Sequence, residues 1–450
     1  MSPTSGILSA GGWFVFSSRE LDELAAYRAT VATDRGYLYC SARAPGAWLD
    51  VDDCYAGDWP ATRLNTDDGR LFTSVMYPSS IYSGTYDGHW MLASNLFLLA
   101  ALLPDGQRLA HDRVTTIDDH GLTALADVTR IGPFTDHCPG VYSEPLANDP
   151  IARMWGDPTI RDARESGERL LDALATSVAA CASADQAPPA VLLSGGVDSA
   201  ALAWTAHQLG LAPIAYSIGT SWGNEHDAAG ELASHCGITQ RRIELTVDDL
   251  EDAIGPSILQ LGHAEPEAVD SVLNVVAALR SGAIAEQTVL SGWGSDLLNA
   301  GLFTSPCSPV AMSQALLAGL RRTQYSSEFS SFAGGICGHR LCHPYWHRAV
   351  VETSLSIDPR CKYGPREKQH LREAMASRVP ASVAWRRKLA LHHGTGVEDG
   401  LSRHFGGVRE KTAAYSEVFQ SLVSRTAAEH LCDVQVPEPL EPSVNLATGG

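Results

Sequence analysis

Residues 190–210 constrain the fold of this chain more than any other segment, and they read AVLLSGGVDSAALAWTAHQLG. The apolar residues 190–193 predict a buried strand, residues 194–196 a tight turn, and the residues from 198 onward a helix that Gly210 ends. Such a turn presents backbone N–H groups and the positive end of a helix dipole to an anion. SGGxDS is more specific than an ordinary strand–helix turn, and it lacks the lysine of a GxxxxGK[ST] loop. We therefore predict a phosphate site formed by Ser194, Gly195, Gly196, Asp198 and Ser199.

The segment that follows alternates predicted strands and helices. Such alternation predicts an α/β fold with a parallel sheet and right-handed crossovers. Ligands of these sheets bind at the carboxyl ends of the strands. We expect strands at 213–218, 241–245 and 288–290, and helices at 225–235, at 247–261 with a break at Pro256, and at 268–279.

A second Ser/Gly turn, SGWGSD, occupies residues 291–296 directly after the strand expected at 288–290. Asp198 and Asp296 would then both lie at carboxyl ends of parallel strands and face one crevice. Two carboxylates beside a polyphosphate suit Mg²⁺, which prefers oxygen ligands. The alternative is that Asp296 only caps the next helix. The repetition of the Ser/Gly–Asp pattern favours metal binding by Asp198 and Asp296.

The remaining segments divide the chain into regions. Residues 1–155 predict a β-rich half, and the chain from residue 311 onward is mostly helical. The last residues, 433–450, are rich in proline without periodicity, which predicts a disordered tail. The expected strands of the first half are 12–17, 36–42, 71–77, 88–93 and 140–142, with a helix at 96–103. The other expected helices are 161–185, 311–322, 347–356, 366–377 and 413–430.

Composition narrows the function. The 450 residues are 44% hydrophobic and carry a net charge of −19, with no Lys/Arg-rich run, so a nucleic-acid partner is not expected. The sequence contains no recognisable signal peptide and no membrane-spanning segment, and we expect a cytoplasmic enzyme with reduced thiols. The segment CGHRLCH at 337–343 is a weak zinc pattern, and buried thiols are the better interpretation.

Several segments together resemble the asparagine synthetase superfamily, most of all its β-lactam synthetase and carbapenam synthetase branch. They are SGGVDSAA at 194–201, YSIGT and NEHDAA within 216–228, SGWGSD at 291–296, HPYWHRAV at 343–350, GPREKQHLREAM at 364–375 and RRKLALHHGTG at 386–396. The resemblance covers about residues 160–410. It implies a degenerate glutaminase-like domain of the Ntn type at 1–155 and an adenylating synthetase domain at 156–432. Ser2 stands where that glutaminase would need a cysteine, so no glutamine hydrolysis is expected.

The resemblance implies ATP and Mg²⁺ as the groups that this site binds. The substrate carboxylate would attack the α-phosphorus, giving an acyl-adenylate and pyrophosphate. Adenine would lie near residues 192–193 and 216–219. Lys368 matches a lysine that contacts pyrophosphate, although without the resemblance it reads as a solvated helix residue. The nucleotide-binding residues so implied, beyond the first turn, are Leu192, Ser217, Ile218, Gly219, Gly292 and Lys368.

The second half-reaction needs a base, because an ordinary amine with a pKa near ~10 is protonated at neutral pH. In β-lactam synthetases a Tyr–Glu pair does this, and Glu328 stands where the glutamate is expected. Trp293 occupies the position of the tyrosine, so Glu328 would act alone or with Tyr325. Lys388 matches the lysine that stabilises the oxyanion, although it also reads as part of a basic surface patch.

Three functions remain open on the sequence. The first is an ATP-dependent synthetase that closes a carboxylate onto an amine of the same small molecule, forming a lactam in specialised metabolism. The second couples the carboxylate to a separate amine or to a peptide N-terminus, as lasso-peptide cyclases do, and Trp293 favours it. The third is an inactive ATP-binding homologue. Neither a nucleic acid nor a membrane is expected as a partner, and a homodimer stays open.

Overall fold

The structure is a computed structural model of the 450-residue chain. It describes residues 158–183, 187–303, 305, 307–326, 328, 338–387 and 390–425, and within the first 157 residues the segments 14–21, 29–33, 36–40, 48–50, 63–65, 70–73, 82–86, 88–93, 96–102, 107–109, 113–118, 121–124 and 130–133. The strand predicted at 140–142 and the tail at 433–450 lie outside these residues.

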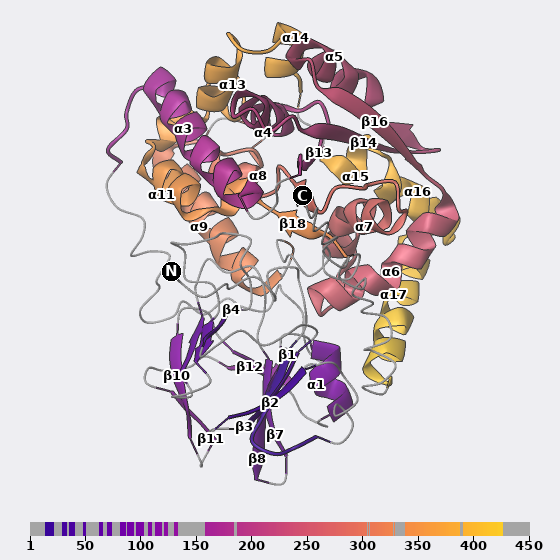
Figure 1. Ribbon diagram of the computed structural model, residues 1–450. Coiled ribbons are helices and arrows are strands. Elements are labelled where there is room, and N and C mark those ends of the chain that lie inside the picture. The colour runs from indigo at the N-terminus through magenta and orange to yellow at the C-terminus, as the bar shows by residue number, and fades with distance from the viewer. Residues whose placement is uncertain are drawn as a thin grey trace, which may run out of the picture.

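The first half of the chain is β-rich, as predicted, and forms two antiparallel sheets that lie at the bottom of Figure 1. The larger sheet has the order β12-β9-β7-β8-β1-β3-β2 and the smaller one the order β11-β10-β6-β5-β4. Helix α1 (Leu96–Leu102) follows β8. The strands are β1 (Phe14–Ser17), β2 (Ala29–Thr33), β3 (Gly36–Cys40), β4 (Trp48–Asp50), β5 (Arg63–Asn65), β6 (Arg70–Thr73), β7 (Tyr82–Tyr86), β8 (His89–Ala93), β9 (Gln107–Leu109), β10 (Arg113–Asp118), β11 (Gly121–Ala124) and β12 (Arg130–Pro133).

The second half is built on a parallel sheet with the order β16-β14-β13-β17-β18. Its strands are β13 (Ala190–Leu192), β14 (Ile214–Thr220), β16 (Thr239–Leu245), β17 (Thr288–Leu290) and β18 (Arg340–Cys342), and the short β15 (Gly223–Asn224) pairs with the end of β14 in antiparallel fashion. The chain leaves β13 toward β14 on one side and later returns to β17 on the other. The sheet therefore has a topological switch point between β13 and β17, where ligands bind in such folds.

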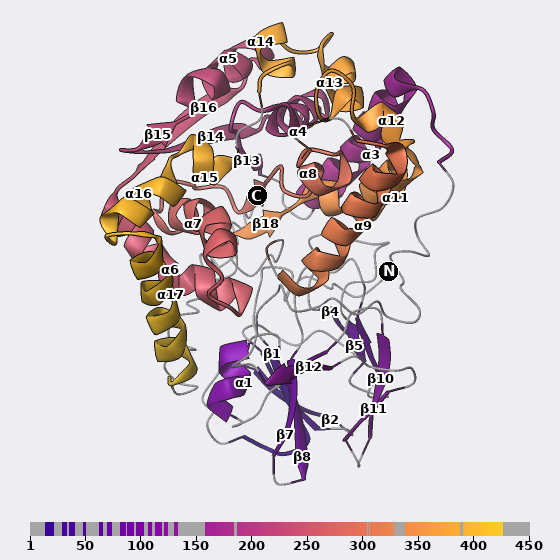
Figure 2. The same ribbon diagram turned by 180° about the vertical axis from the view of Figure 1, so that it is seen from behind.

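Helices cover both faces of this sheet (Figures 1 and 2). Alternate strand residues point to opposite faces. Leu192 and Tyr216 join one apolar cluster with α6 and α7, while Val191 and Ala215 join another with α3 and α4. The helices around the sheet are α3 (Ala163–Ala182), α4 (Val197–Gln208), α5 (His226–Cys236), α6 (Val247–Leu261), α7 (Pro266–Arg280) and α8 (Ser295–Leu298).

The rest of the chain is mostly helical, as predicted. It comprises α9 (Pro309–Ser326), η4 (Pro344–Trp346), α11 (Arg348–Ser356), α12 (Pro359–Lys362), α13 (Gln369–Met375), α14 (Ala381–Ala384), α15 (Leu391–Gly394), α16 (Val397–His404) and α17 (Val408–Val423). No helix of the described chain is long and apolar enough to cross a membrane.

The prediction of a break at Pro256 is wrong, because α6 runs through it without interruption. Thr246 and Asp249 form a capping box that starts the helix, and Gly262, with φ +74°, ends it. Proline removes one backbone donor. Pro256 is only half-buried, so water can hydrate the carbonyl that loses its donor.

Candidate active site

A cavity of about 820 Å³, counted with its open mouth, lies at the carboxyl ends of β13, β14 and β17. Residues from segments far apart in the sequence line it. They are Leu192, Leu193, Ser194, Gly196, Val197, Asp198, Ser199, Tyr216, Ile218, Glu225, Val275, Ser291, Gly292, Trp293, Asp296, Lys368, Arg372, Arg386, Arg387 and Leu391.

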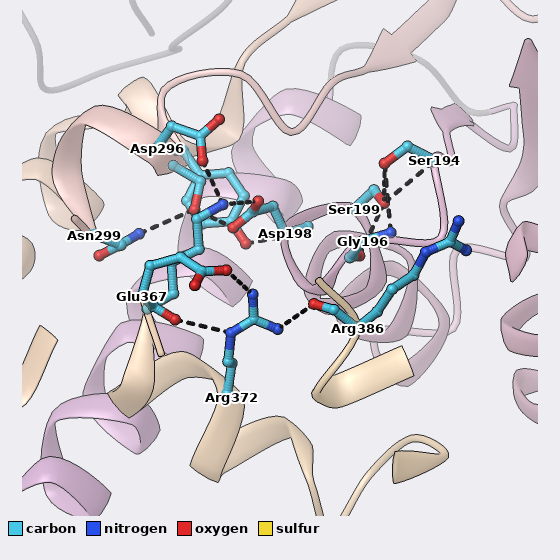
Figure 3. A network of polar contacts seen from close by, with 12 residues as sticks. Ser194, Gly196, Asp198, Ser199, Asp296, Asn299, Glu367, Arg372 and Arg386 are labelled. Atoms are coloured by element: carbon cyan, nitrogen blue, oxygen red, sulfur yellow. Dashed lines mark hydrogen bonds and ion pairs between the residues drawn. The ribbon is translucent and has the colours of Figure 1, made fainter. Parts of the chain in front are cut away.

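The turn at residues 194–196 presents the beginning of α4 to this cavity. Gly195 adopts φ +72°, and a Cβ there would lie 2.6 Å from the Cβ of Ala228, so only glycine fits. The Ser199 hydroxyl donates to the Gly196 carbonyl at 3.1 Å and accepts from the Ser194 backbone N–H at 3.3 Å (Figure 3). Side-chain hydrogen bonds thus fix the turn, and α4, with 12 residues, directs its positive dipole end into the cavity.

Two carboxylates meet one ammonium group at the mouth of this turn. Lys368 Nζ forms ion pairs with Asp198 Oδ2 and with Asp296 Oδ1 (Figure 3). The lysine side chain is only 1% exposed, whereas those of Asp198 and Asp296 are 19% and 35% exposed. Burial alone would lower the pKa of Lys368, but the two aspartate charges and their hydrogen bonds outweigh it, so the pKa lies above its ordinary value. The ammonium therefore remains charged at neutral pH.

A buried polar network holds the first of these carboxylates from behind. Ser295 Oγ donates to Asp198 Oδ1 at 2.5 Å, and Asn299 Nδ2 donates to Ser295 Oγ at 3.1 Å. His370 Nε2 lies 3.2 Å from Asn299 Oδ1, and the Tyr345 hydroxyl donates to the Asp198 carbonyl at 3.0 Å. Ser295 of α8 thus orients the Asp198 carboxylate, and Tyr345 of η4 holds the backbone of the same residue.

A second cluster of charges was not predicted from the sequence. Arg372 is buried, and its Nη1 donates to the Ala384 carbonyl at 2.8 Å. The same nitrogen donates to the Arg386 carbonyl at 2.9 Å (Figure 3). The Arg386 guanidinium donates to Glu225 Oε1 at 3.0 Å. Burial raises the pKa of Glu225 to about 7, although the charge of Arg386 opposes this. In the described chain no hydrogen-bond partner reaches Glu225 Oε2.

Trp293 forms an aromatic wall of the cavity. Its ring stacks on His343 with a centroid distance of 5.3 Å and an angle of 22° between the planes. His343 Nδ1 lies 2.6 Å from Ser291 Oγ, which fixes the imidazole. Val275 and Leu391 add apolar surface to the same cavity. An indole in this position provides shape and no proton acceptor.

The structure places most of the predicted nucleotide-site residues around this one cavity. Ser217 faces away from it, because its hydroxyl lies 2.8 Å from His226 Nδ1 and accepts from Gln240 Nε2 at 2.9 Å. Gly195 and Gly219 also do not line it. The residues that do line it are Leu192, Ser194, Gly196, Asp198, Ser199, Ile218, Gly292, Asp296 and Lys368.

None of the three residues predicted for the chemical step is among the described residues that line the cavity. Glu328 is a half-buried turn residue after α9 and does not line the cavity as described. Tyr325 belongs to the last turn of α9, and its side chain is not among those described. Lys388 lies outside the described residues, between Arg387, which lines the cavity, and α15.

The donor set fits a divalent cation. Asp198 and Asp296 already converge on a single positive charge, and both remain partly exposed toward the cavity. Carboxylate oxygens are the ligands that Mg²⁺ prefers, together with phosphate oxygens and water. These two residues would hold such an ion.

The fold and the site define an α/β protein that has a Ser/Gly turn and a pair of aspartates at the switch point of its parallel sheet. The family model "Asparagine synthase" matches residues 169–335 and 337–436, which is more than half of the chain. The chain therefore belongs to the asparagine synthase family.

Two curated relatives match the chain. Carboxyethyl-arginine beta-lactam-synthase of Streptomyces clavuligerus is 30% identical over 217 residues, covering 48% of this chain and 42% of the relative. Asparagine synthetase B (glutamine-hydrolyzing) of Escherichia coli K12 is 26% identical over 266 residues, covering 54% and 48%. The chain thus spans less than half the length of each.

Two solved structures also show a likeness. NMN synthetase from Francisella tularensis is 16% identical with a TM-score of 0.30, covering 63% of this chain and 99% of that one. Glutamine-dependent NAD+ synthetase from Acinetobacter baumannii, in complex with ADP, is 15% identical with a TM-score of 0.25, covering 71% and 52%.

Proposed function

We propose that this protein is an ATP-dependent, AMP-forming amide synthetase. It adenylates a substrate carboxylate and couples it to an amine, intramolecularly to a lactam. One observation carries the proposal: Asp198 and Asp296 lie in the first turns of the helices that follow the adjacent parallel strands β13 and β17, and they converge in one cavity. Membership of the asparagine synthase family and the β-lactam synthase relative support the reaction class. The first 155 residues would then be a degenerate glutaminase-like domain.

In the first half-reaction the substrate carboxylate oxygen bonds to the α-phosphorus of ATP. The bond from that phosphorus to the bridging oxygen breaks, and pyrophosphate leaves. The 194–196 turn and the α4 dipole bind phosphate oxygens, and Lys368 neutralises charge on the leaving pyrophosphate. Mg²⁺, when bound by Asp198 and Asp296, would offset the phosphate charge. Leu192 and Ile218 offer apolar contact to adenine.

In the second half-reaction the amine attacks the acyl carbon and AMP leaves. The amine must first lose a proton, and Glu328 is the proposed base, with Tyr325 as its partner. Lys388 would stabilise the oxyanion, an effect worth roughly several kcal/mol. These three roles rest on sequence position.

Trp293 favours a second candidate, an intermolecular ligase or peptide macrolactam cyclase. Its ring lines the cavity where β-lactam synthetases have a tyrosine, so the amine would meet an apolar wall there. Product mass separates the two candidates. An intramolecular closure gives one product that is a single substrate minus one water, whereas coupling to a separate amine joins two substrates.

The adenylation proposal is tested with purified protein, Mg-ATP and a pool of candidate amino acids. We expect AMP and pyrophosphate in a 1:1 ratio, and Asp198→Ala should abolish their release. Asp227→Asn is the matched control, because that aspartate is 97% exposed and does not line the cavity. ADP and phosphate as products would refute the mechanism. No turnover with any substrate, together with unchanged ATP binding by Asp198→Ala, would favour an inactive homologue.

The base assignment has its own test. Glu328→Gln should keep substrate-dependent exchange of labelled pyrophosphate into ATP and lose amide formation by about 10²-fold or more. Glu165→Gln, on exposed surface of α3, serves as the control. Amide formation at the full rate in Glu328→Gln would show that another group takes the proton.

A further inference from the structure

The ion-paired position of Lys368 bears on how a metal ion can enter this site. Its ammonium contacts Asp198 Oδ2 and Asp296 Oδ1, the two carboxylates that would hold the ion. The side chain is 1% exposed, so little solvent screens its charge. The Lys368 ammonium thus already forms an ion pair with each of the two carboxylates.

Neighbouring residues hold both Lys368 and the carboxylates in position. Lys368 adopts φ +58°, which is uncommon for a residue with a side chain, directly before α13. Gly301 leaves no free space beside it, because a Cβ there would collide with both Lys368 Cε and Asp296 Oδ1. The carboxylate of Asp198 is held by Ser295. An incoming cation therefore meets an organised site whose negative charge is partly neutralised.

We propose that Lys368 is a built-in counter-cation that keeps Asp198 and Asp296 together, so that a divalent metal enters this site with the nucleotide and not alone. The proposal rests on the metal–nucleotide site of the proposed function. A metal ion entering alone would lie beside a buried ammonium, and the two charges repel. A metal–ATP complex brings phosphate oxygens, which give the ammonium a new partner as it yields the carboxylates. Lys368 thereby sets the order of binding.

The test measures Mn²⁺ binding from the loss of the electron paramagnetic resonance signal of the free ion. Three proteins are titrated: wild type, Lys368→Met and Lys368→Arg. Without nucleotide, wild type and Lys368→Arg should bind Mn²⁺ weakly, and Lys368→Met should bind it about tenfold or more tightly. Adding Asp296→Asn to Lys368→Met should remove that gain. With α,β-methylene-ATP, and after subtraction of the Mn²⁺ that the analogue binds without protein, wild type should bind Mn²⁺ at least as tightly as Lys368→Met does alone.

Several outcomes would overturn the inference. In the first, wild type binds Mn²⁺ without the analogue as tightly as with it. In the second, Lys368→Arg gains Mn²⁺ affinity as Lys368→Met does. In the third, Lys368→Met folds but binds Mn²⁺ no more tightly than wild type. If Lys368→Met fails to fold, the wild-type comparison with and without the analogue still decides the matter. The assay contains no carboxylate substrate. Products of the wrong kind in the turnover assay would therefore reject the amide synthetase proposal without changing these titrations.

Discussion

At the scale of single residues, Glu225 stands out among the described residues that line the cavity, because burial shifts its pKa strongly. Its carboxyl group is buried, accepts a hydrogen bond from Arg386 and lies beside Gly394, where an added Cβ would be 2.8 Å from Oε2. Burial disfavours its charged form and raises its pKa from 4.5 to about 7. The folded protein therefore keeps a proton that the unfolded chain releases at lower pH.

This shift predicts a pH dependence of stability. The pKa of Glu225 is higher in the folded protein than in the unfolded chain. The stability that the protonated carboxyl group contributes is therefore fully present below pH 4.5 and is lost as the pH rises through about 7. The loss amounts to about 3 kcal/mol. Urea unfolding of wild type and Glu225→Gln between pH 4 and 8 measures it, and the variant should lack this part of the slope. Identical slopes in both proteins would contradict the assignment, and Glu165→Gln, which is exposed, should behave as wild type.

Gly301 supports a second prediction at this scale. In Gly301→Ala the new Cβ would displace Asp296 or Lys368. A misplacement of about 1 Å costs roughly 10²-fold in rate, so we expect AMP and pyrophosphate release to fall by about that factor. Gly255→Ala, within α6, is the control, because its Cβ would meet only Val418 Cγ1 at 4.0 Å. A fully active Gly301→Ala would mean that the carboxylate–lysine cluster tolerates displacement.

Among the elements, α7 and α17 are joined by a buried ionic cluster. Lys411 Nζ lies 2.5 Å from Asp270 Oδ2, and the Tyr415 hydroxyl donates to Asp270 Oδ1 at 2.7 Å. The side chains of Lys411 and Asp270 are 3% and 2% exposed. Burial raises the pKa of Asp270, and the hydrogen bonds from Lys411 and Tyr415 lower it only in part. The carboxylate thus depends on its partners.

Removing one partner should therefore be costly. Lys411→Met leaves a buried carboxylate without its cation, and we expect the free energy of unfolding to fall by about 3–5 kcal/mol. Adding Asp270→Asn should recover much of this loss, because no charge then stays buried. Urea unfolding measures both variants, with Arg409→Met, at an exposed position of α17, as the control. A double variant that is no more stable than Lys411→Met would show that packing, not charge, accounts for the loss.

The elements of the second half were largely predictable from the sequence. The strand at 288–290 and the helix at 247–261 have the predicted bounds, since a short apolar run and a capping box are local signals. Pro256 misled the prediction because its effect depends on exposure, which sequence alone does not give. Glu225 and Arg386 are 161 positions apart in the sequence, and Arg372 donates to the Ala384 carbonyl. No periodic pattern in the sequence predicts either contact, because both depend on the tertiary fold.

For the whole molecule, the two halves share apolar core. Phe97 of α1 packs edge-on against Phe419 of α17 with ring centroids 5.3 Å apart. The α1 residues Leu96 and Leu99 are 1% and 0% exposed and belong to the same cluster as residues of α6 and α7. Figure 2 shows α17 extending from the parallel-sheet half toward α1. The motifs identified in the sequence all lie in the second half, yet helix α1 of the first half packs against that half.

Because the two halves share this core, the second half is not expected to fold into a stable, soluble protein without the first. A chain beginning at residue 156 would carry every motif of the adenylation site and would leave the α17 surface around Phe419 open to water. We expect such a truncated chain to aggregate or to bind a hydrophobic fluorescent dye, whereas the full chain does neither, as size-exclusion chromatography and dye titration would measure. A soluble, monomeric fragment with no dye binding would contradict this. The practical unit for purification, crystallisation and engineering of the site is therefore a chain that keeps α1 with α17.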